Sequence, residues 1–321
     1  MRDLALISRY TSRMRETVDK AGSEGVAPSP LINFAPAAFV GLWATGFIGG
    51  KLGLPYAGPL TFLLIRFIAV LLILAPLAFF MKATWPASKT DYAHTAVAGL
   101  MLHAGYLGGV FSAIHHGMSA GVVSLIVGLQ PVLTAVLAAV WLKDKVTRTQ
   151  WIGLTLGFIG VALVVSGKSN LTHADSMSYA LALMALCSIT LGTLYQKRYC
   201  PNLNLVSGAV IQYSACAVLY LLLAPLTENM QVRWTGQFIF ALGWLVVVLS
   251  IASIMLLYVL IQRGAATRVT SLFYMVPPAT AVMAWLIFNE TMTGWALAGM
   301  ALCGAGVLLV VRQPSQGDKA K

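Results

Sequence analysis

The sequence predicts an all-α integral membrane protein whose ten transmembrane helices form two inverted repeats of five helices. Three observations support this fold class: a composition poor in charge, ten apolar segments of membrane-spanning length, and an internal duplication. Of the 321 residues, 59% are hydrophobic and only 10% are charged, whereas a soluble domain has about 25% charged residues. Most of the protein surface is therefore expected to face lipid rather than water.

Ten apolar segments follow one another along the chain. Each is close to the ~20 residues that a helix needs to cross about 30 Å of hydrocarbon. Most of the connections between them are short, so consecutive helices are expected to be antiparallel neighbours. The segments are residues 31–50, 59–81, 93–114, 119–142, 149–167, 177–197, 203–225, 236–262, 267–288 and 293–312.

An internal duplication relates the two halves of the chain. Residues 120–165 align without a gap with residues 266–311, at an offset of 146, and 15 of the 46 aligned positions are identical. The identical pairs include Pro131 with Pro277. Self-similarity at a fixed offset indicates a repeated structural unit. We therefore expect a first five-helix repeat at residues 31–167 and a second at residues 176–312.

The distribution of Lys and Arg predicts the orientation in the membrane. If the N-terminus is cytoplasmic, 17 basic residues fall in cytoplasmic segments and only three, Lys51, Lys168 and Arg233, fall outside. Because cytoplasmic loops carry the excess of positive charge, both termini are expected to be cytoplasmic, in a multi-pass protein of the cell inner (plasma) membrane. An odd number of helices per repeat then makes the two repeats inverted.

The two ends of the chain are expected to be cytoplasmic tails, at residues 1–30 and 313–321. The first 30 residues contain five basic and four acidic side chains and no apolar stretch long enough for a signal peptide. A disordered tail is favoured, and a short basic helix on the membrane surface at residues 4–14 stays open as the alternative.

The distribution of charge and of cysteine argues against a nucleic-acid-binding protein, a metal site and a disulfide framework. The net charge of +11 does not indicate nucleic-acid binding, because the basic residues occupy alternate loops instead of one patch. The four cysteines have neither the spacing of a metal site nor that of a disulfide framework. We therefore expect no nucleic-acid partner, no metal and no cofactor.

Several short motifs, taken together, resemble the EamA branch of the drug/metabolite transporter superfamily. The resemblance covers about residues 31–312 and implies a bundle of two inverted five-helix units that moves a small metabolite across the membrane. Asp144 is a departure, since the family usually has Glu there. The motifs are residues 42–51 (LWATGFIGGK), 64–67 (LIRF), 130–137 (QPVLTAVL), 276–281 (VPPATA) and 289–291 (NET).

The symmetric prolines are candidate hinges. Pro131 and Pro277 lie about midway along two apolar segments, where proline removes one backbone hydrogen bond and clashes with the preceding turn. Since a freed carbonyl in lipid needs another partner, the two bends are predicted to line a central cavity. The alternative is that both are tolerated kinks.

Ionisable side chains within the apolar segments are few, so each is informative. No Asp or Glu lies at the middle of a segment, and His103 is the mid-depth group whose ordinary pKa lies near neutral pH, with Tyr106 about one turn later on the same face. We expect both to contact substrate; a proton relay by His103, or a simple hydrogen bond between helices, are the alternatives.

Arg66 is the cation within the second segment. It is predicted either to attract an anionic group such as a carboxylate or to extend to the interface. A phosphorylated substrate is not expected, because phosphate recognition would call for several cations in the cavity. The remaining candidates for substrate binding are the aromatic and amide side chains Trp43, Gln130, Tyr195, Tyr258, Tyr274 and Trp285.

These features and the resemblance predict a membrane transporter that works by alternating access between the repeats. Its partners would be the lipid bilayer and a small-molecule substrate such as an amino acid or an amphipathic compound, and a homodimer is compatible with the sequence. The resemblance favours export. Uptake and a passive channel remain alternatives. A membrane-embedded enzyme is disfavoured, because it would need a nucleophile–base pair or a metal-ligand cluster.

Overall fold

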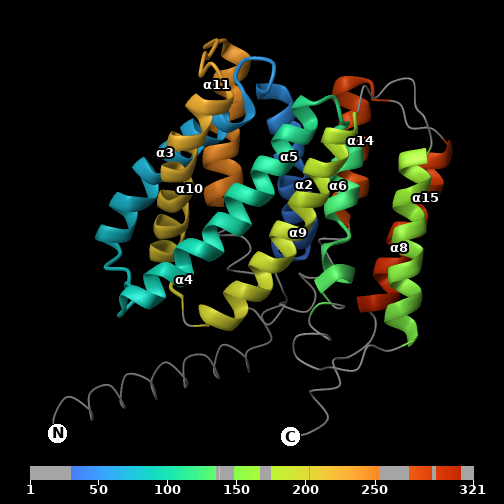
Figure 1. Cartoon of the computed structure of the whole chain (residues 1–321), viewed down its shortest axis with the longest axis horizontal. Coiled ribbons are helices and arrows are strands. Elements are labelled where there is room, and N and C mark those ends of the chain that lie inside the picture. The colour runs from blue at the N-terminus through green and yellow to red at the C-terminus, as the bar shows by residue number, and fades with distance from the viewer. Residues whose placement is uncertain are drawn as a thin grey trace, which may run out of the picture.

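The computed structural model describes residues 30–134, 137, 148–166, 175–201, 203–252, 275–290 and 294–311. These residues form a bundle of tilted helices (Figure 1) and, within those ranges, no β-strand beyond one isolated bridge between Ala57 and Val232. The helices are α2 (Pro30–Gly53), α3 (Pro59–Phe80), α4 (Lys89–Gly99), η1 (Leu100–Gly105), α5 (Tyr106–His115), α6 (Ala120–Val127), α8 (Arg148–Ser166), α9 (Ser176–Tyr199), α10 (Leu205–Thr227), α11 (Gly236–Gly243), η2 (Trp244–Ala252), α14 (Val276–Phe288) and α15 (Gly294–Val311).

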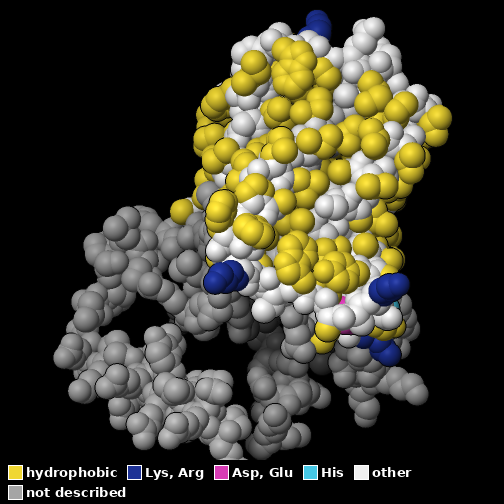
Figure 2. Space-filling view, turned by 90° about the vertical axis from the view of Figure 1, so that its left-hand side faces the viewer, with side chains coloured by type: hydrophobic (Ala, Val, Ile, Leu, Met, Phe, Trp, Pro, Cys, Tyr) yellow, Lys and Arg dark blue, Asp and Glu magenta, His cyan; other side chains and the backbone are white. Residues whose placement is uncertain are grey.

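The helices and their surface have the build of an all-α membrane protein. Four continuous helices in the described part are long and apolar enough to cross a bilayer, at Pro59–Phe80, Lys89–His115, Ser176–Tyr199 and Leu205–Thr227. Shorter apolar helices accompany them, including Val276–Phe288. Figure 2 shows hydrophobic side chains over the middle of one face and Lys and Arg at its two ends. Large apolar residues such as Leu72, Phe79 and Leu226 are exposed, as expected of a surface that contacts lipid.

The duplication is visible in the helix boundaries. Three pairs of helices contain equivalent residues of the duplicated sequence and begin at the 146-residue offset: Pro30 and Ser176 (α2 and α9), Pro59 and Leu205 (α3 and α10), Arg148 and Gly294 (α8 and α15). Two of these pairs, α3 with α10 and α8 with α15, also pack against each other.

Two π-helical segments, η1 and η2, occupy equivalent positions in the two halves. Each continues an α-helix without a gap, and each lies within a segment that the sequence predicts to be one helix, at residues 93–114 and 236–262. A π-helical turn adds a residue to the helix and redirects the side chains that follow, and such turns are frequent at functional sites.

Hydrogen bonds join the two halves of the chain at one end of the helix bundle. Helix α11 lies at one end of the bundle (top of Figure 1), which we call the Glu290 end; the opposite end is called the Lys197 end. At the Glu290 end, the loop at residues 54–58 is joined to the loop before α11. The backbone N–H of Arg233 donates to the carbonyl of Tyr56 at 2.9 Å, and the Tyr56 hydroxyl donates to Gln237 Oε1 at 2.7 Å.

Glu228 caps the first turn of α3 from the other half of the chain. Its carboxylate accepts hydrogen bonds from the backbone N–H groups of Leu60 (2.7 Å) and Thr61 (2.9 Å), and from the Thr61 hydroxyl (2.6 Å). The N-terminal N–H groups of a helix have no partner within the helix and favour negative charge. Glu228 therefore ties the start of α3 to the end of α10.

We expect Glu228→Ala to destabilise the protein by about 0.5–2 kcal/mol, the usual cost of removing a helix N-cap. Thermal unfolding in detergent measures this as a lower Tm. Thr227→Ala is the matched control, because the Thr227 hydroxyl donates only within its own helix, to Leu223 at 3.0 Å. Equal Tm values for the two variants would contradict the capping role.

Candidate functional site

A cavity of about 180 Å³ lies between helices of both halves of the chain. Its wall includes Trp43 of α2, Arg66 of α3, His103 of η1 and Tyr106 of α5 from the first half, and Tyr213 of α10 and Ser250 of η2 from the second half. Both π-helical segments thus contribute side chains to the wall. A largely apolar cavity with a few converging polar groups is the usual form of a small-molecule site.

Arg66 is the charged residue of this wall. Its side chain is buried, with 3% of the residue exposed, and Nη2 donates to the hydroxyl of Ser250 at 3.0 Å. Nε and Nη1 have no hydrogen-bond partner among the described residues. No Asp or Glu is among the described residues that line the cavity. A guanidinium at this depth carries a high solvation cost that one serine hydroxyl does not offset.

His103 is held by a chain of amide hydrogen bonds. Its Nε2 lies 3.1 Å from Gln212 Oε1, and Gln212 Nε2 donates to Gln196 Oε1 at 2.9 Å. Since Gln212 Oε1 can only accept, this orientation of the amide places the imidazole proton on Nε2. Nδ1 is then the ring nitrogen that can accept a hydrogen bond. The ring also packs on Tyr213, at 4.6 Å between centroids.

Aromatic rings fill the space from the cavity toward the Glu290 end. Phe111 lines the cavity and packs on Phe62, which in turn packs on Phe238, with ring centroids 5.5 and 5.0 Å apart. Gly53 makes room for this cluster, because a Cβ there would lie 2.3 Å from the Phe62 ring. The cluster joins α3 and α5 of the first half to α11 of the second.

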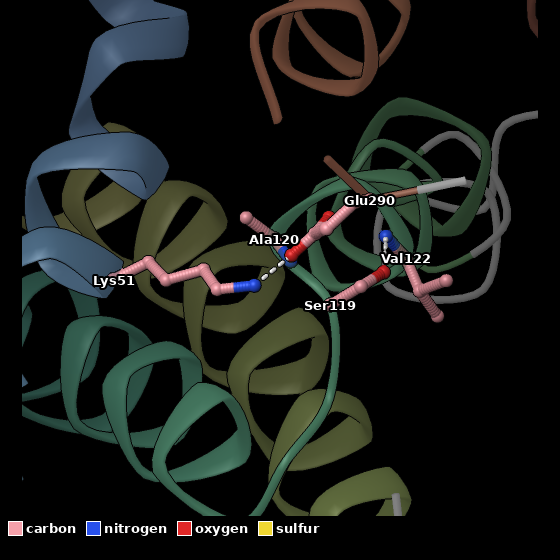
Figure 3. Close-up of polar contacts among 5 residues, drawn as sticks. All are labelled: Lys51, Ser119, Ala120, Val122 and Glu290. Atoms are coloured by element: carbon pink, nitrogen blue, oxygen red, sulfur yellow. Dashed lines mark hydrogen bonds and ion pairs between the residues drawn. The ribbon is translucent and has the colours of Figure 1, made fainter. Parts of the chain in front are cut away.

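An ion pair between Lys51 and Glu290 lies at the Glu290 end (Figure 3). Lys51 Nζ donates to Glu290 Oε1, which also accepts from the backbone N–H of Ala120 at 3.4 Å. Ala120 is the first residue of α6, whose N-cap Ser119 accepts from the Val122 N–H. The carboxylate therefore faces both an ammonium group and a helix N-terminus, each of which attracts negative charge. One side chain of the second half bridges two helices of the first.

Other predicted site residues lie elsewhere. Gln130 donates to the Thr193 hydroxyl at 3.1 Å, and the Tyr195 hydroxyl lies 2.7 Å from His94 Nδ1; neither residue lines this cavity. Trp285 is 55% exposed on α14 and does not line it either. Tyr258 and Tyr274 lie outside the described residues.

The two predicted hinge prolines are found in segments that contact each other. Helix α6 ends at Val127, four residues before Pro131, and residues 130–134 are helical again. Pro277 lies in the first turn of α14 as described, and a Cβ on Gly128 would be 2.6 Å from its Cγ. The break in α6 therefore packs against the start of α14. Whether either residue acts as a hinge stays a prediction.

Sequence reasoning missed part of the wall. Tyr213 and Ser250 were not predicted, although an aromatic residue in the middle of an apolar segment is a signal that could have identified Tyr213. Ser250 has no such signal. Its place in the wall depends on η2, which the sequence does not reveal.

One family model and several curated relatives match this chain over most of its length. The EamA-like transporter family matches residues 33–166 and again residues 176–312. The uncharacterized transporter YvbV of Bacillus subtilis (strain 168) is 29% identical over 88% of this chain and 92% of its own length. A probable amino-acid metabolite efflux pump of Salmonella typhimurium is 28% identical over 87% of this chain and 94% of its own. A second probable amino-acid metabolite efflux pump, from Escherichia coli (strain K12), is 25% identical over 84% of this chain and 91% of its own length.

A solved structure has the same fold. A chain known from a crystal structure superimposes with a TM-score of 0.58 at 16% sequence identity, covering 86% of this chain and 94% of that one.

Proposed function

Because this chain belongs to the EamA-like transporter family, we propose that it exports a small amino acid or a related metabolite by alternating access. It is a membrane transporter, and the cavity between its halves is the proposed substrate site. The observation that carries this proposal is the composition of the cavity wall, which takes residues from both segments that match the family. Sites between two halves of a repeat are where alternating-access transporters bind substrate.

The proposed arrangement is ten transmembrane helices in two inverted repeats, at residues 31–167 and 176–312, with both termini in the cytoplasm. The shared helix offsets and the equivalent positions of η1 and η2 support the repeats. The excess of Lys and Arg on one side supports the orientation. In this arrangement the Glu290 end faces the outside of the cell.

Alternating access requires that one end of the cavity closes while the other opens. The aromatic cluster of Phe62, Phe111 and Phe238 and the Lys51–Glu290 ion pair support closure at the Glu290 end. Each joins helices of the two halves. We propose that the ion pair is an outer gate, which breaks when α14 moves away from α2 and α6.

Amino acids are the proposed substrates for two reasons. Two relatives are named as probable amino-acid metabolite efflux pumps, which also supports export over uptake. The second reason is size: the cavity of about 180 Å³ is smaller than the ~300–1,000 Å³ of pockets that hold drug-sized ligands, which suits a small molecule.

The proposal is tested by counterflow in proteoliposomes containing the purified protein, with a panel of amino acids, nucleobases and cationic drugs. We expect saturable counterflow of at least one small amino acid. Trp43→Ala and His103→Ala should lower it about tenfold or more while expression is unchanged, because each removes a side chain from the cavity wall. Flux without saturation or counterflow would favour a passive channel and contradict alternating access.

A further inference from the structure

We infer that Arg66 binds the carboxylate of the transported substrate, and that this contact makes the cavity selective for small amino acids and other monocarboxylates. The inference rests on the proposed transport function and adds the group that is recognised and the residue that recognises it. It starts from a buried cation in the cavity wall, Arg66, two of whose three side-chain nitrogens have no hydrogen-bond partner within the described part of the chain.

The Arg66 guanidinium keeps one pair of parallel N–H groups (a fork) available to bind a carboxylate. Arginine binds carboxylate through two parallel N–H groups, either Nη1 with Nη2 or Nε with Nη2. The hydroxyl of Ser250 takes one hydrogen of Nη2. Whichever hydrogen that is, the second hydrogen of Nη2 still forms a fork with Nη1 or with Nε, both of which have no partner among the described residues.

The acidic residues of the described part of the chain are all engaged elsewhere. Glu228 caps α3, and Glu290 pairs with Lys51. Asp91 accepts from Ser88, and Asp175 accepts from Ser178. None of them lines the cavity. A charge at this depth is retained where it has a function and a partner. The described acidic side chains do not supply that partner, and the cavity gives a substrate carboxylate access to Arg66.

The rest of the wall suits the remainder of an amino acid. The rings of Trp43, Tyr106 and Tyr213 can attract an ammonium group through their faces. Nδ1 of His103 is an acceptor, since Nε2 carries the proton. A phosphate dianion fits less well, because Arg66 is the single Lys or Arg among the described residues that line the cavity and phosphate recognition calls for several cations.

The test compares each amino acid with its amide in the reconstituted wild-type protein. The two ligands have nearly the same size, and the amide lacks the negative charge. With an isotope-labelled amino acid that shows counterflow, unlabelled acids should compete at least about tenfold better than the matching amides, since hydrogen bonds to charged groups are the strong ones. This comparison needs no mutant and is independent of folding defects.

Two variants then assign the effect to Arg66. Arg66→Gln should abolish the preference for acid over amide, and Arg66→Lys should retain only part of it, because a lysine keeps the charge without the fork. Thr227→Ala is the control and should keep the preference, because the Thr227 hydroxyl donates to Leu223 in its own helix and Thr227 does not line the cavity. Thermal unfolding in detergent confirms that each variant is folded.

The outcomes separate the two proposals. Equal competition by acids and amides in the wild-type protein, or an acid preference that persists in Arg66→Gln, would overturn the role of Arg66 and leave transport in place. Absence of counterflow for every compound in the panel would instead refute the proposed transport function, and the inference that depends on it would fall too.

Discussion

Glu290→Gln is expected to open the cavity to reagents added at the Glu290 end and to slow transport. The amide retains the size of the side chain and can still accept from the Ala120 N–H, so the variant removes only the charge that attracts Lys51. The pair is partly exposed, at 29% for Lys51 and 12% for Glu290. Its loss is therefore expected to shift the gate equilibrium by about 1–2 kcal/mol, or about five- to thirty-fold.

Cysteine labelling measures this shift. Leu107 lines the cavity, and Leu107→Cys in a background without the four native cysteines gives one reactive thiol there. A membrane-impermeant thiol reagent, applied to intact cells, should label this thiol about five- to thirty-fold faster in Glu290→Gln than in the parent protein. Lys89→Ala, a loss of one cation at the Lys197 end, is the control and should label at the parent rate.

Charge exchange gives a second readout of the same gate. Lys51→Glu alone places two carboxylates together and should open the gate further than Glu290→Gln does. The exchange Lys51→Glu with Glu290→Lys should restore closure only in part, because the new lysine faces the N-terminus of α6, which disfavours positive charge. Labelling and transport at parental values in both single variants would show that the ion pair does not act as a gate.

The fold could be predicted from sequence because its determinants repeat along the chain. The position and length of an apolar segment predict where a helix crosses the membrane. The predicted segment at residues 59–81 accordingly corresponds to α3 at Pro59–Phe80. Proline chemistry predicts the break in α6. Pro131 has no N–H to donate to the carbonyl of Val127, and α6 ends at that residue. The π-helical segments were not predictable, since an i→i+5 turn has no pattern of residue types that separates it from an α-helix.

The candidate site could be predicted only as far as residue type allows. Arg66 and His103 were identified because ionisable groups are rare at this depth. Gln130 and Tyr195 are polar too, but their partners Thr193 and His94 come from other helices. Sequence alone cannot distinguish a polar side chain that bonds between helices from one that faces a cavity, because the difference lies in the rotation of each helix about its axis.

Gly109→Ala is expected to lower the Tm of the protein by several degrees in detergent. Gly109 lies in α5, which packs against α9 of the other half. A Cβ at this position would be 2.6 Å from the carbonyl oxygen of Leu181 and 3.1 Å from the backbone N of Ala185. Backbone atoms cannot rotate away, so α5 and α9 must separate. Overpacking of this kind costs about 1–3 kcal/mol. At about 2.1 cal/mol/K of unfolding entropy per residue, each kcal/mol lowers the Tm of a chain of 321 residues by roughly 1–2 °C.

Gly243→Ala is the matched control, because the same change in α11 meets no atom of the described residues within 4 Å. There the gain in helix propensity, up to about 1 kcal/mol, is not opposed and Tm should stay the same or rise. Apolar helices in lipid gain little from hydrophobic contact with each other, so close approach at small residues is a main source of their association. An equal rise in Tm for both variants would mean that α5 and α9 can separate at Gly109 without loss of stability. Close approach of their backbones would then not be what holds these two helices together.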